Sequence, residues 1–369
     1  MNTNNWIERT KLRHRMCLEW RSNGAAALAV SVPTGVPRNW TRWFQDPAVM
    51  LEGELAKLKN CLAVQSDVVP VAFPNFTAAV VVSLFGAEIN FHENGPVYSP
   101  VFTDTADIDR LAVPPLDGGL MPQIERAIDY FRERVPDFVE VTPPYIHTPL
   151  NSAALLRGPG EFYADLCLEP QRAHRLLSIV TETAAGAATR LFDHLGRPPA
   201  PFTNWMGIHL GDLVHISDDC CVNLSPDFIT TFDLDYVDIL STHLGTQFCT
   251  HYCVMPRQGD LAEHCLEPTC ACAATQAICN QYSPEYFLEH YDRFENRLAL
   301  ISQVGFPGIP LGQSRQERLG RFRDAAEDFL DRFQGKSGLI LTCGAPTVEE
   351  ARDLYSIWDS LCPWPEEAG

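Results

Sequence analysis

Short apolar runs alternate with long stretches of helical periodicity throughout this chain. Each run is apolar at consecutive positions, which is typical of strands that are covered on both faces. The clearest runs are 67–73, 247–254, 299–304 and 338–343. A strand followed by a helix, repeated many times, indicates parallel β/α units. We therefore expect an α/β protein built as a single (β/α)8 TIM barrel, with an open doubly wound sheet as the main competitor.

Several helix starts are visible in the sequence. Ser225-Pro226 and Ser283-Pro284 each place a capping side chain before a proline suited to the first helical turn, and Thr347 with Glu350 forms a capping-box pattern. Leucine, valine and small residues recur through 169–196, which predicts a long packed helix. We expect residues 1–60 to form an N-terminal helical extension and residues 61–369 to form the barrel.

Charge and composition limit the partners and the location. The chain has 28 Lys and Arg against 47 Asp and Glu, a net charge of −19, which repels phosphate backbones and anionic lipid surfaces. No apolar run approaches the ~20 residues that cross a bilayer, and the start of the chain lacks the pattern of a secretory signal. We expect a cytoplasmic protein that binds neither nucleic acid nor membrane, with its 13 cysteines present as thiols.

Common nucleotide-binding and hydrolase motifs are absent. Gly335-Lys336-Ser337 lacks the first glycine of a P-loop because Leu330 occupies that position, and 158–160 is not followed by a dinucleotide fingerprint. The sequence contains neither HExxH nor GxSxG. These absences argue against kinases, common NAD oxidoreductases and α/β-hydrolases.

A candidate metal site begins at His251 and Cys253. Residues two apart on a strand project to the same face, so both side chains can reach one ion at the end of the run 247–254. Cys343 ends the run 338–343 and is expected at the same rim of the barrel. Imidazole and thiolate are preferred zinc donors, and barrel chemistry gathers at the carboxyl ends of strands. The alternative is that these cysteines are buried as small apolar side chains.

The remaining cysteines fit no standard metal pattern. His264, Cys265, Cys270, Cys272 and Cys279 have irregular gaps, so we expect packing, with an accessory metal or redox role as the alternative. Cys220 and Cys221 are adjacent and would face opposite sides of a strand, so these two are also expected to pack.

Acidic and amide side chains are expected near the same rim. Asp218 and Asp219 follow the strand-like run 209–217, where a carboxylate could bind substrate or exchange protons, or could simply solvate a loop. Asn151 either lines the pocket or forms a turn. Tyr145 and His147 are weaker candidates.

Taken together, these residues resemble the uroporphyrinogen decarboxylase superfamily, in particular its zinc-dependent corrinoid methyltransferase branch. The similar segments are 85–87, 148–158, 217–221, 224–228, 251–253 and 342–346. The resemblance implies a (β/α)8 barrel in which His251, Cys253 and Cys343 bind zinc. A further acidic ligand occurs in that branch, but Glu263 and Glu267 are only nearby in the sequence.

The same resemblance implies the function. We expect a methyl group to pass from a methylcobamide, carried by a corrinoid protein, to a zinc-bound thiol or a similar acceptor such as a folate. Asp219 is then the expected catalytic residue, with Asn151, Asp218 and Tyr252 as substrate-binding residues. A homodimer is a possible assembly.

Two alternatives remain open. One is metal-free decarboxylation of a tetrapyrrole or aromatic acid, with Asp219 stabilising a protonated ring. Members with that activity carry an arginine-rich N-terminal motif, whereas this chain has only Arg38 and Arg42 in the corresponding region. The other is a corrinoid or tetrapyrrole carrier without turnover.

Overall fold

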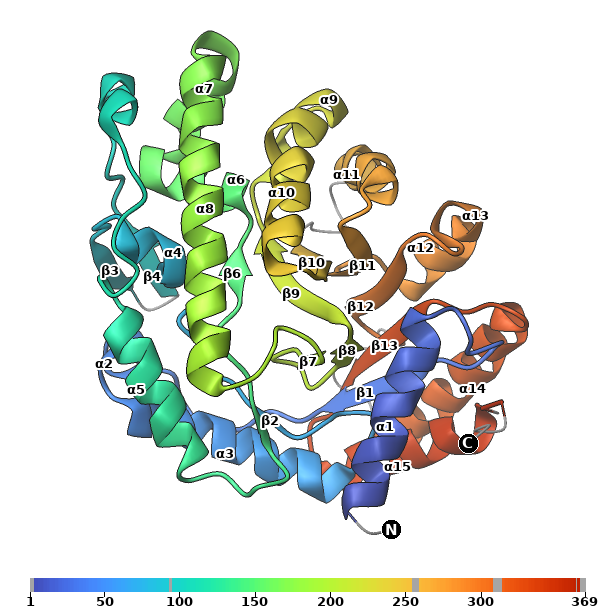
Figure 1. The fold of residues 1–369 in the computed structure, drawn as a ribbon. Coiled ribbons are helices and arrows are strands. Elements are labelled where there is room, and N and C mark those ends of the chain that lie inside the picture. The colour runs from blue at the N-terminus through green and yellow to red at the C-terminus, as the bar shows by residue number, and fades with distance from the viewer. Residues whose placement is uncertain (1–2, 93–94, 254–258, 308–313, 363, 366–369) are drawn as a thin grey trace.

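The computed structural model describes residues 3–92, 95–253, 259–307, 314–362 and 364–365 (Figure 1). For residues 259–263 it describes the backbone but not the side chains. Parallel strands surround a central axis and helices cover the outside (Figure 1). The strands of this wall are β1 (Ala27–Ser31), β2 (Val71–Ala72), β5 (Glu140–Val141), β6 (Ile146–His147), β9 (Leu213–Asp218), β10 (Gln247–Tyr252), β11 (Thr275–Asn280), β12 (Ala299–Gly305) and β13 (Leu339–Gly344).

The order of strands confirms the expected barrel. Seven strands form one sheet in the order β1-β13-β12-β11-β10-β9-β6, and β2 pairs in parallel with β5. β5 and β6 occupy one position of the wall, and Pro143 and Pro144, which have no N–H to donate to a ladder, lie between them. The predicted runs 247–254, 299–304 and 338–343 correspond closely to β10, β12 and β13.

The helices fill the connections between strands. They are α1 (Thr3–Leu18), α2 (Trp40–Gln45), α3 (Pro47–Val64), α4 (Ala79–Leu84), α5 (Met121–Arg132), α6 (Pro149–Arg157), α7 (Pro159–Leu168), α8 (Pro170–Leu195), α9 (Pro226–Ile229), α10 (Asp235–Leu244), α11 (Gly259–Ala271), α12 (Pro284–Glu289), α13 (Tyr291–Phe294), α14 (Arg315–Phe333) and α15 (Val348–Leu361). Ser283 and Thr347 cap α12 and α15 as predicted, each accepting a backbone N–H. Among the described helices, none combines the length and apolar character that a membrane crossing needs.

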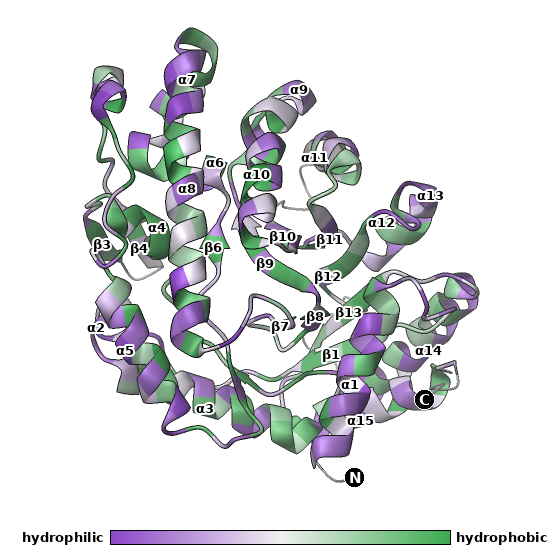
Figure 2. Cartoon of the chain, in the orientation of Figure 1, coloured by the Kyte–Doolittle hydropathy of each residue, from purple (hydrophilic) through white to green (hydrophobic). Residues whose placement is uncertain are grey.

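Hydropathy follows this layering. Many of the outer helices carry polar residues along one side and apolar residues along the other, while β9 and β12 are largely apolar (Figure 2). Two antiparallel hairpins interrupt the alternation, namely β3 (Ile89–His92) with β4 (Gly95–Tyr98), and β7 (Phe202–Thr203) with β8 (His209–Gly211). The second hairpin contacts α1 through the N–H of His209, which donates to Nδ1 of His14 at 3.0 Å.

The boundary predicted at residue 60 is wrong for one element. β1 lies inside the segment predicted as a helical extension, yet it pairs in parallel with β13 along its whole length, from Ala27 with Ile340 to Ser31 with Gly344. The apolar segment 25–32 is therefore a wall strand. A barrel that lacked this strand would leave β13 with an unpaired edge, so the closed fold starts at Ala27.

A buried carboxylate joins β1 to the chain that leads into β2. Asp67 is fully buried, and its Oδ2 accepts the N–H of Leu28 at 3.0 Å. Its Oδ1 accepts the phenol of Tyr355 at 2.7 Å and the guanidinium of Arg13 at 3.2 Å. One side chain therefore ties β1, α1 and α15 together at the place where the ladder between β1 and β2 is missing.

We predict that Asp67→Ala lowers the free energy of unfolding by about 2–4 kcal/mol, because the N–H of Leu28 loses its acceptor and the buried guanidinium of Arg13 keeps, among the described residues, only Asp359 as an ionic partner. Asp353→Ala is the matched control, since it removes an exposed ion pair with Arg315 and should cost under about 1 kcal/mol. Urea unfolding of both variants provides the measurement. Equal losses in the two variants would contradict the role given to Asp67.

Candidate metal centre

The carboxyl ends of β9 and β10 bring the candidate residues to one rim. The two strands pair in parallel, with Ser217 opposite His251 and Asp218 opposite Tyr252. Because side chains alternate along a strand, His215, Ser217 and Asp219 share one face of β9 and its extension. His251 and Cys253 share the equivalent face of β10.

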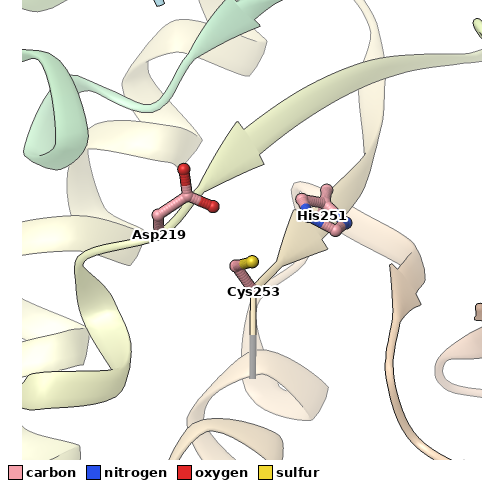
Figure 3. Close-up of side chains that lie close together, drawn as sticks. All are labelled: Asp219, His251 and Cys253. Carbon is pink, nitrogen blue, oxygen red and sulfur yellow. The ribbon is translucent and has the colours of Figure 1, made fainter. Parts of the chain in front are cut away.

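Asp219, His251 and Cys253 converge at this rim. A carboxylate oxygen, an imidazole nitrogen and the sulfur, one from each residue, all lie within 4.8 Å of one another. Figure 3 shows the three side chains gathered where β9 and β10 end. A carboxylate, an imidazole and a thiolate are all established zinc donors, so the residues present fit that ion. The centre is accessible, because Asp219 and Cys253 are exposed.

A hydrogen bond fixes the form of His251. Its Nδ1 lies 2.6 Å from the backbone oxygen of Cys279, and a carbonyl can only accept, so Nδ1 carries the proton. The lone pair is then on Nε2, which is the form that a metal ligand needs. Bonds of this kind commonly orient histidines in metal sites.

Asp219 is also held in place. Its backbone N–H donates to Oδ1 of Asn151 at 3.1 Å, and Asn151 is buried in the first turn of α6. Although both side chains reach the surface, partial loss of hydration raises the pKa of Asp219, and the same effect together with the Asp219 charge raises the pKa of Cys253. Both anionic forms are therefore disfavoured without a cation nearby, and a bound cation would relieve both.

The structure does not bring Cys343 into this group. Thr342 borders a cavity of about 400 Å³ that also contacts Gln303 of β12 and Met206, and residues next to each other on a strand face opposite sides. Burial raises the pKa of Cys343 to about 12, and the negative charge of Glu350 adds to this rise. Glu350 belongs to α15, which lies on the outside of the wall. The third residue grouped with His251 and Cys253 is Asp219 rather than Cys343.

Two predicted substrate-binding residues also face away from the rim. Asp218 is buried and its carboxylate accepts the N–H groups of Cys220 and Cys221 at 2.6 and 2.8 Å. The phenol of Tyr252 is buried and receives a hydrogen bond from Thr269 of α11 at 3.2 Å. Both residues lie one position from a rim residue, so strand alternation directs them toward the outer helices. Asn151 positions Asp219 through its side-chain oxygen.

An aromatic and histidine layer below the centre was largely missed. The rings of Tyr145 and His215 are 5.2 Å apart, and those of His215 and His251 are 6.3 Å apart. Nε2 of His147 lies 4.0 Å from a carboxylate oxygen of Asp219. The sequence indicates His147 and Tyr145 only weakly as residues of the rim, and His215 is a residue that sequence reasoning missed. Its spacing of two and four residues from Ser217 and Asp219 is the signal that could have found it.

These buried histidines are neutral. Burial lowers the pKa of His147 to about 4 and that of His215 to about 3. In each ring Nδ1 has no hydrogen-bond partner among the described residues. The floor of the rim is therefore built from uncharged polar rings.

The later cysteines do not form one cluster in the part of the chain that the structure describes. Cys279 faces the barrel interior, where its sulfur accepts from Gln303 at 3.3 Å. Cys265 is buried on α11, Cys270 and Cys272 are half-buried, and His264 is exposed. Cys220 and Cys221 are buried, as expected. Glu267 is exposed, and the side chain of Glu263 lies outside the described residues.

Comparison with known proteins agrees with the sequence motifs. A family model described as uroporphyrinogen decarboxylase (URO-D) matches residues 38–208. No curated protein matches the chain in sequence. A methyltransferase from Methanosarcina mazei has a similar structure, with a TM-score of 0.66 over 95% of this chain and 98% of that chain, at 17% identity. At this identity the likeness shows a shared fold. The family model thus confirms the predicted resemblance to the superfamily over residues 38–208, and the structural likeness supports the barrel fold.

We predict that Cys253 of the metal-free protein reacts with a thiol-alkylating reagent at least tenfold faster than Cys343. Cys253 is exposed, whereas Cys343 is 3% exposed and its thiol is disfavoured as a thiolate by burial. Peptide mapping by mass spectrometry measures both rates, with exposed Cys167 as an internal reference. Comparable labelling of Cys343 and Cys253 in the folded protein would contradict the placement of Cys343.

We also predict that stability falls as the pH drops from about 6.5 toward 4. The unfolded histidines titrate near 6.5, whereas His215 stays neutral in the fold down to about pH 3, so protons bind preferentially to the unfolded chain in this window. For one histidine the loss at pH 5 is about 2 kcal/mol relative to pH 7. Urea unfolding should show that His215→Gln loses less stability over this interval than the wild type. Identical losses would contradict the prediction.

Proposed function

Starting from the resemblance of this chain to the uroporphyrinogen decarboxylase superfamily, we propose that it is a zinc-dependent methyltransferase. It moves a methyl group from a methylated corrinoid, bound to a separate protein, to a thiol acceptor. The observation that carries this proposal is the convergence of Asp219, His251 and Cys253 at an accessible rim of the barrel.

The donor set suits this chemistry by its charge. One carboxylate, one thiolate and a neutral imidazole together balance the two charges of Zn²⁺, and they leave the fourth position of a tetrahedral site for the acceptor. Zinc bound in this way supplies a Lewis acid that favours ionisation of the acceptor thiol near neutral pH while the sulfur stays electron-rich. This charge balance is the same as the one implied by His251 with two cysteines, because Asp219 replaces one thiolate by one carboxylate.

The surrounding residues keep the donors in place. Asn151 holds the backbone of Asp219, and the carbonyl of Cys279 holds the ring of His251. Tyr145, His147 and His215 form an uncharged floor beside these donors, which limits competition from other charged groups. A preorganised set of this kind avoids reorganisation when the acceptor binds.

Access to the rim is consistent with a protein-bound donor. The side chain of Asp219 is 49% exposed, and Cys253 is exposed as well. A reacting methyl group held on another protein has to reach the acceptor from outside the barrel. Donors at an open rim allow this approach, whereas donors deep in the barrel would not.

Decarboxylation of an aromatic or tetrapyrrole acid is the alternative, and the name of the matching family favours it. Binding several carboxylates calls for cationic side chains, yet the rim carries Asp219 and histidines that burial keeps neutral. The guanidinium of Arg38 lies over the rings of Trp40 and Trp43, at 4.8 and 4.5 Å from their centroids, and its charge acts on Tyr145 in the floor, so in the described part of the chain one cation stands near the rim rather than an arginine-rich cluster. The donor set therefore supports methyl transfer better than decarboxylation.

We predict that Cys253→Ser lowers zinc affinity at this centre by ~100-fold or more and lowers methyl transfer to match, since a second-sphere change alone commonly costs 10–100-fold. Cys343→Ser is the matched control and should keep both, because Cys343 packs outside the rim. Zinc is measured by competition with a chromophoric chelator, and transfer is measured from methylcobalamin to a panel of thiols.

Two outcomes would contradict this proposal. Loss of zinc affinity in Cys343→Ser as well as in Cys253→Ser would restore the ligand set implied by the sequence resemblance, in which both cysteines bind zinc. Transfer that persists in the zinc-depleted wild type would remove the metal from the reaction.

A further inference from the structure

A second group of potential ligands lies buried on the other face of β9. A carboxylate oxygen from each of Asp218 and Asp233 and the sulfur of Cys221 all lie within 4.8 Å of one another, and all three residues are buried. Asp218 is adjacent to Asp219 in sequence but faces the outer helices, so this group is separate from the rim. The proposed methyl transfer uses none of the three.

The burial of an acidic side chain at Asp233 has no explanation in the packing of the fold. It lies in η3 (Thr230–Leu234), a π-helical turn between α9 and α10, and it is fully buried. As a carboxylate it receives no N–H or O–H with good geometry among the described residues, and its nearest polar neighbours are the carboxylate of Asp218 and the hydroxyl of Thr148. A buried carboxylate without a partner is costly, so such a group is normally protonated or bound to a cation. Single π-helical turns are frequent at functional sites.

Asp218 is oriented as a ligand would be. Its Oδ1 accepts the backbone N–H groups of Cys220 and Cys221, and its Oδ2 accepts the hydroxyl of Thr148. Carboxylates that bind metals are typically held by outer hydrogen bonds of this kind. These bonds occupy three of the about four acceptor positions of the carboxylate, so Oδ2 can still offer one lone pair to a ligand.

Cys265 stands close to this group. The thiol of Cys265, on α11, neighbours the sulfur of Cys221, and burial together with this neighbour raises the pKa of Cys221 well above its usual value. Cys265 is 2% exposed. The three grouped donors come from β9, η2 (Cys221–Asn223) and η3 and are buried, and the sulfur of Cys265 on α11 lies beside Cys221 but outside the group, so it has to move inward to become a fourth donor.

We infer that Asp218, Cys221 and Asp233, with Cys265 as the fourth donor, form a closed structural zinc site. Four protein donors and no open position are the features of structural rather than catalytic zinc. The ion would join η2, η3 and α11 behind β9, and so would brace the strand end that carries Asp219. Because the site is sealed, the ion has to be taken up during folding.

A protonated acid pair is the competing explanation. Burial and the nearby Asp218 charge raise the pKa of Asp233 well above its usual value, so one proton shared by the two carboxyl groups would also relieve the repulsion. The two explanations differ in zinc content and in the effect of replacing Asp233 by its neutral analogue.

The decisive experiment leaves the buried group intact. The full-length double variant His251→Ala/Cys253→Ser lacks two of the three rim donors, so zinc that remains after dialysis against a chelator reports on the buried site. We expect one equivalent of zinc in this variant by mass spectrometry of the metal, and a thiolate-to-Co²⁺ absorption band after refolding with Co²⁺. Absence of both zinc and the band would overturn the inference. If the wild type and the double variant each bind one equivalent of zinc, the buried site is supported and the rim centre is contradicted.

A second comparison separates a metal ion from a shared proton. Asp233→Asn should lose one equivalent of zinc and unfold at lower urea concentration, because the amide cannot replace an anionic ligand. Asp235→Asn, at an exposed position two residues away, is the matched control and should keep the wild-type zinc content. If Asp233→Asn keeps the wild-type zinc content and stability, the acid pair is correct and the zinc site is not. Should this variant fail to fold, the double variant still decides.

Discussion

Closure of the barrel depends on a side chain where a strand ladder is missing. β1 and β2 share no ladder, and the N–H of Leu28 instead donates to the buried carboxylate of Asp67. Arg13 and Tyr355 complete the shell around that carboxylate, so a helix from each end of the chain is held at the same seam. On the far side of the wall, β9 and β10 pair directly with each other, and this register sets the spacing of Asp219, His251 and Cys253.

Alternation along β9 gives two adjacent acids different environments. Asp219 lies at the open rim with His251 and Cys253, and Asp218 is sealed behind the wall with Cys221 and Asp233. A change of one position in the strand exchanges these environments, because the side-chain period is two. The Ser-Asp-Asp segment can therefore serve catalysis on one face and bracing on the other. The inferred ion behind β9 would also resist movement of the strand end on which Asp219 depends.

The same alternation explains which site residues could be predicted from the sequence. His251 and Cys253 are two apart on one strand, so their shared direction follows from the sequence alone once the strand is recognised. Cys343 belongs to a different strand, and its direction depends on the register with which β13 joins β1 and β12. That register places Thr342 toward the cavity and Cys343 toward α15. Tyr252 and Asp218 were assigned to the substrate for the same reason, since their proximity in sequence to rim residues concealed their opposite orientation.

The sequence by itself determined the β/α alternation, the barrel, the superfamily resemblance and the pairing of His251 with Cys253, because each depends on local spacing or on motifs. Only the tertiary structure decided that Asp219 completes the rim group, that β1 belongs to the wall, and that Asp233 meets Asp218 behind it. These contacts join segments that are distant along the chain. Their geometry is set by strand register and helix packing, which no local pattern of residues encodes.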